Sequence, residues 1–496
     1  MSGVVGERLS VDLVVIGGGP AGSTLAARLA QLGHKVALLE REAFPRPRLG
    51  ESLTPGVRSL LRLTGADEPV QRAGFPSIES VLVDWDDGPC ERRDEGAQGL
   101  LVDRGQFDLL LLEHARALGV GVLQPAVVAE RRHDGERWRL RVDAEGGSVL
   151  VDASFLAAAG GRSGALPGCR SPAGARTVAL HAYWRGFQPS LQPRIQALAD
   201  TWCWGVPLPD GTVDILAFVD PERLRSDRDS VEASYHELVN GSVFGDEAAG
   251  AQRVSAVRAA DATPYLSSEC VTEAAIRVGD AGISLDPISS SGVQKAVQTA
   301  LAGAVVVNTI LRRPGAAETA RRFYCNSLER ASARHRTWAA AHYAAAAATR
   351  TSQFWTSRAR FSDVPAEAAP RAASPGVNHR LEVSHRVEFV DLPCVAGEFV
   401  ELKTAVAHPC LDEPVAFLGD WELAPLLRRV PAGKTSGELV QAWSELVPRE
   451  AGVAISEWLG RNGILVAAGS RGVRSTEPLR RAGAGFADGE AEKRER

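Results

Sequence analysis

Three glycines near the start of the chain have the spacing with which a backbone loop can hold a pyrophosphate. An apolar segment from Val11 to Ile16 leads directly into Gly17, Gly19 and Gly22, in the pattern G-x-G-x-x-G. In such a loop the first glycine allows a tight turn, the second lets the backbone approach the phosphates, and the third lets the helix pack against the strand. The following helix directs its positive N-terminus at the anion. These residues predict a dinucleotide site after a first β-strand.

An acidic residue closes the second strand of the same unit. Residues 35–39, K-V-A-L-L, are largely apolar, and Glu40 and Arg41 follow them. A carboxylate at this point of a strand–helix–strand unit accepts a hydrogen bond from a ribose hydroxyl. We therefore expect Glu40 and its neighbour Arg41 to lie beside the nucleotide.

Two later segments favour FAD over NAD. Residues 277–281, R-V-G-D-A, resemble the GD motif of flavoproteins, whose aspartate holds the ribityl chain. Residues 102–108 resemble the R-x-x-F-D segment that places an arginine beside the same cofactor. A helix that begins near Gly292 would direct backbone N–H groups at the pyrimidine end of a reduced, anionic flavin. The candidate FAD-binding residues are Gly17, Gly19, Gly22, Glu40, Arg41, Arg104, Asp280, Pro287 and Gly292.

Over roughly residues 10–360 the chain resembles flavin-dependent halogenases and their hydroxylase relatives. Glu51 lies in a G-E-S segment similar to the strap that covers the flavin, and residues 202–207, W-C-W-G-V-P, are close to the W-x-W-x-I-P signature of halogenases. Residues 342–355 are similar to the helix ending Tyr…S-x-F-W of that group. Ser291 falls where halogenases hold a halide near the flavin.

This resemblance implies an α/β fold. It has a Rossmann-type FAD-binding domain with an inserted antiparallel β-sheet substrate domain, as in aromatic hydroxylases, and a small C-terminal α+β module resembles a winged helix. The expected ranges are 10–75, 100–175 and 270–330 for the cofactor domain, 76–99 and 176–269 for the substrate sheet, and 331–360 for a closing helical segment. A linker at 363–376, the module at 377–470 and a polar tail at 471–496 complete the chain.

The residue that carries halogenation in this family is missing from its usual place. The family's catalytic lysine lies in a segment like G-F-x-x-K-x-G-A-x-F-x-W, and the matching residues 74–85 have Ile78 at the lysine position. The lysines of the chain are Lys35, Lys295, Lys403, Lys434 and Lys493. Without an amine to carry the halogenating oxidant, the resemblance implies oxygenation and not halogenation.

A second departure concerns the electron supply. In hydroxylases that use NAD(P)H, a DG-type motif carries an aspartate that contacts both cofactors. Ala158 occupies that position here, in the segment L-A-A-A-G-G-R-S. We therefore expect a separate flavin reductase or another electron donor.

Few polar residues are candidates for catalysis. Glu51 in the strap and Ser291 before the helix are the nearest polar groups to the expected flavin, although Glu51 is equally suited to capping local backbone. Trp202, Trp204 and Ile78 are the candidate substrate-pocket residues, and a buried aromatic pair on a strand is an equally weighted alternative for the tryptophans. The seven cysteines show no C-x-x-C, so we expect no metal site.

The composition argues against several classes of protein. The 496 residues carry a formal net charge of −5 and no basic block, which argues against a nucleic-acid partner. No apolar run reaches membrane-spanning length, and no basic-then-apolar leader precedes the first strand. We therefore expect a cytoplasmic protein with reduced cysteines and no membrane partner.

The chemistry that remains is that of a reduced flavin and dioxygen. A flavin C4a-hydroperoxide can transfer oxygen to an electron-rich aromatic ring without a lysine relay. The resemblance thus implies an FAD-dependent monooxygenase that hydroxylates an indole or phenol, with a peptidyl tryptophan in quinone-cofactor biogenesis as one candidate substrate. A halogenase with a displaced catalytic group is the first alternative. The second is a non-catalytic flavoprotein that serves as a maturation or binding factor.

Overall fold

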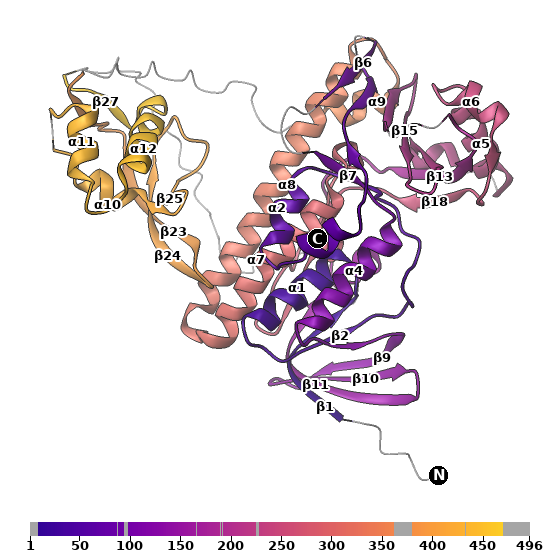
Figure 1. Cartoon of the computed structure of the whole chain (residues 1–496), viewed down its shortest axis with the longest axis horizontal. Coiled ribbons are helices and arrows are strands. Elements are labelled where there is room, and N and C mark those ends of the chain that lie inside the picture. Colours follow the sequence, from indigo (N-terminus) through magenta and orange to yellow (C-terminus); the bar gives the residue numbers. More distant parts are fainter. Residues whose placement is uncertain are drawn as a thin grey trace, which may run out of the picture. The chain divides into compact units, whose positions relative to one another are not determined.

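The computed structural model describes residues 8–469, except 87, 94–97, 165, 189, 191, 225–227, 362–378 and 432. The chain divides into two units (Figure 1). The first unit comprises Met1–Ala366 with Pro393–Lys403, and the second comprises Glu367–Leu392 with Thr404–Arg496. The expected linker at 363–376 and the tail at 471–496 lie outside the described residues. The expected module at 377–470 differs from the second unit in one respect, because residues 393–403 group with the first unit.

A seven-stranded sheet contains the strand that leads into the glycine loop. Its strand order is β8-β2-β1-β11-β10-β9, and β20 also pairs with β11. β1, β2, β8, β11 and β20 are parallel, whereas β9 and β10 form an antiparallel meander. This is the Rossmann-type arrangement that the sequence predicts. The bounds are β1 Arg8–Ile16, β2 Val36–Leu39, β8 Gly121–Leu123, β9 Ala126–His133, β10 Trp138–Ala144, β11 Gly147–Ala158 and β20 Ala275–Arg277.

Helices cover one face of this sheet. α1 (Pro20–Gln31) follows the glycine loop and packs against both α4 (Arg104–Ala117) and α7 (Gly292–Arg312), as Figure 1 shows. Leu13 of β1 is buried beneath these helices, and Val14 is buried against the meander on the other face. Because both faces are covered, β1 is a nearly continuous apolar run and not an alternating one.

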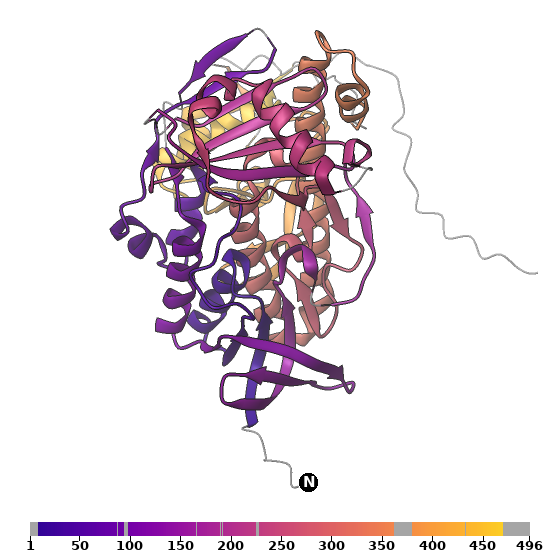
Figure 2. The same ribbon diagram turned by 90° about the vertical axis from the view of Figure 1, so that its right-hand side faces the viewer.

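An eight-stranded, mainly antiparallel sheet forms another part of the first unit. Its order is β17-β13-β16-β15-β14-β5-β6, with β18 also pairing on β13. It lies apart from the seven-stranded sheet in both views (Figures 1 and 2). This is the inserted antiparallel sheet that the resemblance implies. The bounds are β5 Val81–Asp84, β6 Pro89–Arg92, β13 Val178–Arg185, β14 Arg194–Ala197, β15 Trp202–Pro207, β16 Thr212–Val219, β17 Gln252–Arg253 and β18 Arg258–Asp261.

Since side chains alternate along a strand, this sheet has two different faces. The first face is apolar and packs with α5 (Arg228–Asn240) and α6 (Gly245–Gly250). The register defines the second face, because Tyr183 of β13 pairs with Asp214 of β16, which pairs with Val206 of β15. The second face carries His181, Tyr183, Trp202, Trp204, Asp214 and Phe218.

The strand with the sequence W-C-W-G-V-P is divided between the two faces. Trp202 and Trp204 lie on the second face, and Cys203 lies in the apolar cluster of the first face. A Cβ at Gly205 would lie 2.4 Å from the ring of Phe244 in that same cluster. Packing on the first face therefore requires glycine at this position.

A small three-stranded sheet positions the strap. β3 (Ser52–Leu53) and β4 (Ser77–Ile78) pair antiparallel with β7 (Gly99–Leu101), which lies between them. Glu51 immediately precedes β3, and its carbonyl oxygen accepts a hydrogen bond from the Val102 N–H at 2.8 Å. The backbone at the end of the strap is therefore fixed by hydrogen bonds at Glu51 and by the pairing of β3 with β7.

The second unit is an α+β structure with its own apolar core. β22 pairs with β27, and α10, α11 and α12 bury apolar side chains that include Trp443 and Leu459. Thr435 and Glu438 form a reciprocal capping box at the start of α11, as their spacing predicts. Within the described residues no helix is both long and apolar enough to cross a bilayer. The bounds are β22 Leu381–Val383, β23 Glu388–Ala396, β24 Phe399–Ala407, α10 Leu423–Arg428, α11 Ser436–Ala442, α12 Arg449–Arg461 and β27 Leu465–Ala467.

The tip of the β23–β24 hairpin, residues 393–403, is held by α7. Val400 is fully buried in the core cluster that also contains residues of α1 and α7. Its N–H donates to Thr309 Oγ1 at 2.9 Å, and the Asn308 side-chain amide donates to the Glu398 carbonyl oxygen at 2.8 Å. These contacts are the physical reason why the tip groups with the first unit.

Candidate functional site

The glycine loop borders open space where its pattern predicts a pyrophosphate. Gly17 has a φ of +110°, and a Cβ there would lie 2.5 Å from the Ala159 carbonyl oxygen. A Cβ at Gly22 would lie 1.8 Å from the Gly17 carbonyl oxygen. Both positions therefore require glycine. Among the described atoms, a Cβ at Gly19 would meet only Arg46 Nη2, at 3.7 Å. The loop thus has room for a ligand beside a guanidinium.

Arg46 is a buried cation that the sequence analysis did not select. Its Nη1 donates to Asp108 at 3.1 Å, and its Nη2 lies 3.7 Å from Glu40. Its Nε is buried without a hydrogen-bond partner among the described residues. Burial lowers the pKa of Arg46 more than its acidic neighbours raise it. The guanidinium atom that faces Gly19 is Nη2, so a phosphate beside Gly19 would lie within reach of a buried arginine, as the pyrophosphate of FAD requires.

Asp108 explains the R-x-x-F-D segment. Its buried carboxylate accepts from Arg104 Nε at 3.1 Å and Nη2 at 3.2 Å, in addition to Arg46. Arg104 also donates to the Leu49 carbonyl oxygen at the start of the strap. One carboxylate therefore fixes two guanidiniums. A carboxylate such as Asp108 can accept more hydrogen bonds than one arginine donates. This was the signal in the sequence that could have indicated a second arginine partner.

Glu40 lies at the end of β2 with its carboxylate already hydrogen-bonded to backbone. Its Oε2 accepts from the Gly18 N–H at 2.6 Å and its Oε1 from the Glu42 N–H at 2.9 Å. Each oxygen retains a second lone pair for a ribose hydroxyl, which stays a prediction. The Arg41 side chain is 60% exposed and its Nε lies 3.3 Å from Glu42. Its contact with the cofactor also stays a prediction.

The turn that carries the GD motif contains an ion pair. Asp280, in the 3-10 turn Gly279–Ala281, pairs with the ammonium of Lys295 in the first turn of α7. That buried ammonium also donates to the Ile283 carbonyl oxygen at 2.6 Å. Burial raises the pKa of Asp280, but the ion pair with Lys295, together with the charges of Arg162 and Arg104, holds it below its ordinary value. The Asp280 side chain is 39% exposed, which leaves an oxygen accessible to ribityl hydroxyls.

The turn before α7 presents small polar groups. Pro287–Ser289 form a 3-10 turn, and Ser290 follows with a φ of 48°. The hydroxyls of Ser289 and Ser291 lie 2.7 Å apart. A Cβ at Gly292 would meet no described atom within 4 Å. The start of α7 therefore borders open space, as a flavin at its positive end would require.

The strap brings a buried carboxyl group to the start of α7. A Cβ at Gly50 would lie 3.9 Å from Val293 Cγ2. The next residue, Glu51, is 2% exposed; its Oε2 accepts from the Gly50 N–H at 2.8 Å and its Oε1 from the Tyr183 hydroxyl at 2.7 Å. Burial and, after it, the charge of Asp214 raise the pKa of Glu51 to about 7. Such a carboxyl group can hold or release a proton near neutral pH.

Close approaches link these groups into one region. A Cβ at Gly279 would lie 2.8 Å from Ala21 Cβ, so the GD turn touches the start of α1. Asp108 connects the guanidinium beside the glycine loop with the one beside the strap, and Gly50 lies against α7. The glycine loop, Asp280, Ser291 and Glu51 therefore border a single region. Its open backbone positions at Gly19 and Gly292, with the buried Arg46 guanidinium beside the first, fit FAD.

The candidate pocket tryptophans lie on the second face of the eight-stranded sheet. Trp202 is 1% exposed; its ring stacks on Phe218 with centroids 3.8 Å apart, and Trp85 approaches it edge-on at 6.0 Å. Trp204 is partly exposed, and so is Ile78 in β4. The structure thus shows a packing role for Trp202. Contact of these three candidates with a substrate stays a prediction.

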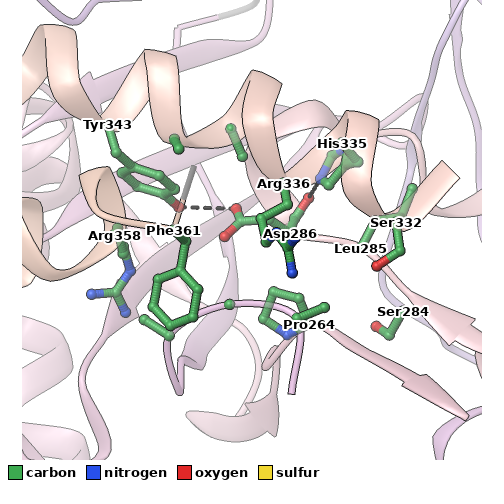
Figure 3. Close-up of a pocket in the computed structure, with 15 residues that line it drawn as sticks. Pro264, Ser284, Leu285, Asp286, Ser332, His335, Arg336, Tyr343, Arg358 and Phe361 are labelled. Atoms are coloured by element: carbon green, nitrogen blue, oxygen red, sulfur yellow. Dashed lines mark hydrogen bonds between the residues drawn. The ribbon is translucent and has the colours of Figure 1, made fainter. Parts of the chain in front are cut away.

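A small pocket with both apolar and polar lining residues lies beside the turn that precedes α7 (Figure 3). The buried Asp286 carboxyl accepts from the Tyr343 hydroxyl at 2.9 Å and from the Ile288 N–H at 3.1 Å, and its backbone oxygen lies 3.2 Å from His335 Nε2. Burial raises the pKa of Asp286. The cavity volume of about 20 Å³ suits one water and is too small for an aromatic ring. Asp286 therefore anchors the turn to α8 (Ala317–Ala347).

Comparisons with known proteins agree with the assignment of this region to FAD binding. The model of the FAD binding domain family matches residues 10–177, and the model of the tryptophan halogenase family matches residues 96–374. The tryptophan 2-halogenase of Chondromyces crocatus is 33% identical over 340 residues, which are 64% of this chain and 64% of that protein. The matched region thus spans slightly less than two thirds of that relative's length.

Two solved structures align with nearly the whole chain. The flavin-dependent halogenase CmlS is 23% identical with a TM-score of 0.76, and the match covers 92% of this chain and 96% of CmlS. The peptidyl tryptophan dihydroxylase QhpG is 26% identical with a TM-score of 0.71, and the match covers 92% of this chain and 99% of QhpG. Because the model of the tryptophan halogenase family matches more than half of the chain, the chain belongs to that family, and the match of the FAD binding domain model shows that its cofactor is FAD.

Proposed function

We propose that this chain is an FAD-dependent monooxygenase that hydroxylates an electron-rich aromatic group. When bound, reduced FAD supplies the chemistry that activates dioxygen. The residues of the chain bind the cofactor, orient the substrate and supply protons, with Glu51 and Ser291 as the candidate catalytic groups. One observation carries the proposal: among the described residues of the first unit, no lysine ammonium is available at the site.

The positions of the described lysines support this statement. Lys35 is exposed and precedes β2, at the end of the strand opposite to the glycine loop. The ammonium of Lys295 is bound between Asp280 and a backbone carbonyl oxygen, so it cannot carry an oxidant to a substrate. Lys403 lies in the hairpin strand β24, and Lys434 lies in the second unit. The resemblance of residues 74–85 to the family's lysine segment puts the apolar Ile78 at the lysine position.

The substrate class is an indole or a phenol, with a peptidyl tryptophan as the specific candidate. The match to the peptidyl tryptophan dihydroxylase QhpG supports this candidate. Both solved structures align with 92% of the chain, so the match extends into the second unit in each case. Because the match to the halogenase CmlS covers as much of the chain as the match to QhpG, the presence of the second unit does not by itself indicate a protein substrate. A separate flavin reductase is the expected electron donor.

The test is a product analysis with reduced flavin, dioxygen and bromide. The purified protein receives an indole, a phenol or a tryptophan-containing peptide, and mass spectrometry identifies the product. Oxygenated product without bromine supports the monooxygenase. Brominated product as the main outcome would overturn it in favour of a halogenase with a displaced catalytic group, the alternative that the relatives' names favour. The variant Ile78→Lys is the matched comparison, because it returns an amine to the family's position.

A non-catalytic flavoprotein is distinguished by kinetics. An enzyme should reoxidise reduced FAD faster with a true substrate than without one, or couple that reoxidation to product. If no aromatic compound changes the rate and no product forms, FAD is a structural ligand. A lower apparent KM for a tryptophan peptide than for free indole would assign the macromolecular substrate.

A further inference from the structure

A buried polar cluster lies on the second face of the eight-stranded sheet. Tyr183 and Asp214 are direct cross-strand partners, and His181 lies two residues before Tyr183 on the same face. The rings of His181 and Tyr183 meet edge to face, with centroids 5.9 Å apart. The Tyr183 hydroxyl donates to Glu51 at 2.7 Å. The sheet therefore has a direct polar connection to the strap.

Asp214 is an unusual residue for the interior of a sheet. It is fully buried; its Oδ1 lies 3.4 Å from His181 Nδ1, and its Oδ2 has no hydrogen-bond partner among the described residues. A buried carboxylate with one open oxygen is costly unless it is protonated or paired. Burial raises the pKa of Asp214, and the hydrogen bond from His181 opposes that rise. A packing role alone would be served better by an apolar residue.

The two buried carboxyl groups interact. The negative charge of Asp214 makes ionisation of Glu51 less favourable, and it acts in the same sense on Tyr183. Two nearby carboxyl groups in a low-dielectric interior do not readily ionise together. Other titratable and charged groups around the cluster are Asp103 and Arg104 at the start of α4, Arg258 opposite His181 on β18, and Cys203 and Tyr235 on the other side of the sheet.

We propose that Asp214, His181 and Tyr183 are positioning residues for Glu51: Asp214 and His181 favour its protonated form, Tyr183 fixes its orientation, and Glu51 is the proton donor for oxygen transfer. The negative charge of Asp214, which the hydrogen bond from His181 stabilises, favours the neutral carboxyl of Glu51, and the Tyr183 hydroxyl sets the orientation of that carboxyl. The step that this proton serves rests on the proposed function. The state of the carboxyl group does not, and it can be measured separately.

The proton balance defines the role of Glu51. Aromatic substrate, dioxygen, one proton and the two-electron-reduced FAD anion give hydroxylated product, oxidised FAD and water. FAD supplies both electrons, one oxygen atom enters the ring, and the other becomes water. Glu51 donates the one proton consumed, and solvent protonates it again before the next turnover.

The cluster predicts that two conservative variants shift the pH at which Glu51 ionises in opposite directions. Asp214→Asn removes a negative charge near Glu51, so the carboxyl group should ionise at lower pH. Tyr183→Phe removes the donor that stabilises the ionised form, so the carboxyl group should ionise at higher pH. His181→Gln removes a hydrogen bond that stabilises the ionised form of Asp214. It should therefore shift the ionisation midpoint of Glu51 in the same direction as Asp214→Asn does. A merely structural role would not give shifts of opposite sign.

Infrared titration of the FAD-loaded protein tests this proposal without a substrate. The carbonyl band of a protonated carboxyl group that is absent from Glu51→Gln reports Glu51, and its loss with pH gives the midpoint. We expect a midpoint near pH 7 in the unaltered protein. It should move down by roughly one pH unit in Asp214→Asn and up by a similar amount in Tyr183→Phe.

Controls keep the result interpretable. FAD absorbance and circular dichroism establish that each variant is folded, and His181→Gln replaces Asp214→Asn if the latter does not fold. Equal midpoints in all variants, or no band that depends on Glu51, would overturn the positioning proposal. Brominated product together with the expected midpoints would overturn the proposed function and leave the carboxyl cluster intact.

Discussion

Replacement of Val400 by alanine tests whether the hairpin tip belongs to the fold that carries the flavin site. Val400 is fully buried in the core cluster that contains residues of α1 and α7. Two methyl groups are lost, at about 0.8 kcal/mol each, and the cavity that remains adds to this cost. We therefore expect the free energy of unfolding to fall by about 2–3 kcal/mol. The measurement is denaturant unfolding of the FAD-loaded protein, followed by flavin fluorescence.

Leu402 provides the matched control in the same strand. Its side chain is 50% exposed, so Leu402→Ala removes more carbon atoms but little buried surface. We expect a change below about 0.5 kcal/mol. Equal destabilisation by the two substitutions, or none by Val400→Ala, would show that the tip does not contribute to the core of the first unit.

The contacts of the hairpin tip with α7 also affect what a truncation that removes the second unit would show. A chain that ends at Pro375 loses Val400 and leaves the buried groups Asn308 and Thr309 without the partners that the tip provides. Such a chain is therefore expected to lose stability and flavin even if the second unit only docks a substrate. Point substitutions in the second unit are the appropriate test of docking.

Three further predictions follow from the site. Gly19→Val should abolish FAD retention in absorbance spectra, because its side chain enters the space beside the loop that the pyrophosphate needs, and the smaller Gly19→Ala should weaken FAD binding less; a yellow valine variant would contradict the assignment. Lys295→Met should weaken FAD binding in a fluorescence titration by 10-fold or more, since Asp280 loses its countercharge; unchanged affinity would show that the pair is only structural. Glu51 ionises at its ordinary pKa when unfolded and at about 7 when folded, so stability should fall as pH rises through this interval, by about 3 kcal/mol in total. Glu51→Gln should abolish this slope in pH-dependent urea unfolding, and an unchanged slope would assign it to another group.

The glycine loop and the GD turn were predictable because their signals are local. Each depends on residues a few positions apart, such as Gly17 and Gly22, whose close approach within the loop demands glycine. The capping box at Thr435 follows from an equally short pattern. The fold class was predictable for the same reason, since the motifs occur in the family's order.

The groups that the sequence did not reveal depend on contacts between distant segments. Arg46 meets Asp108 across 62 residues, and Tyr183 meets Glu51 across 132. His181 and Asp214 become neighbours only through the register of β13 and β16. No short pattern marks such residues, because each is ordinary in its own segment. The grouping of the tip at 393–403 with the first unit has the same cause, since one buried valine on a strand carries no local signal.

The close approach of Gly205 to Phe244 has a consequence for how this family varies through evolution. A side chain at position 205 would collide with the ring of Phe244, so a larger residue there is expected only where position 244 carries a smaller one. Trp204, one residue away, lies on the other face and is free of this constraint. Related sequences should therefore show positions 205 and 244 changing as a pair, whereas this constraint does not act on position 204. Two neighbouring residues of one six-residue signature are therefore subject to different structural constraints, because they lie on opposite faces of the sheet.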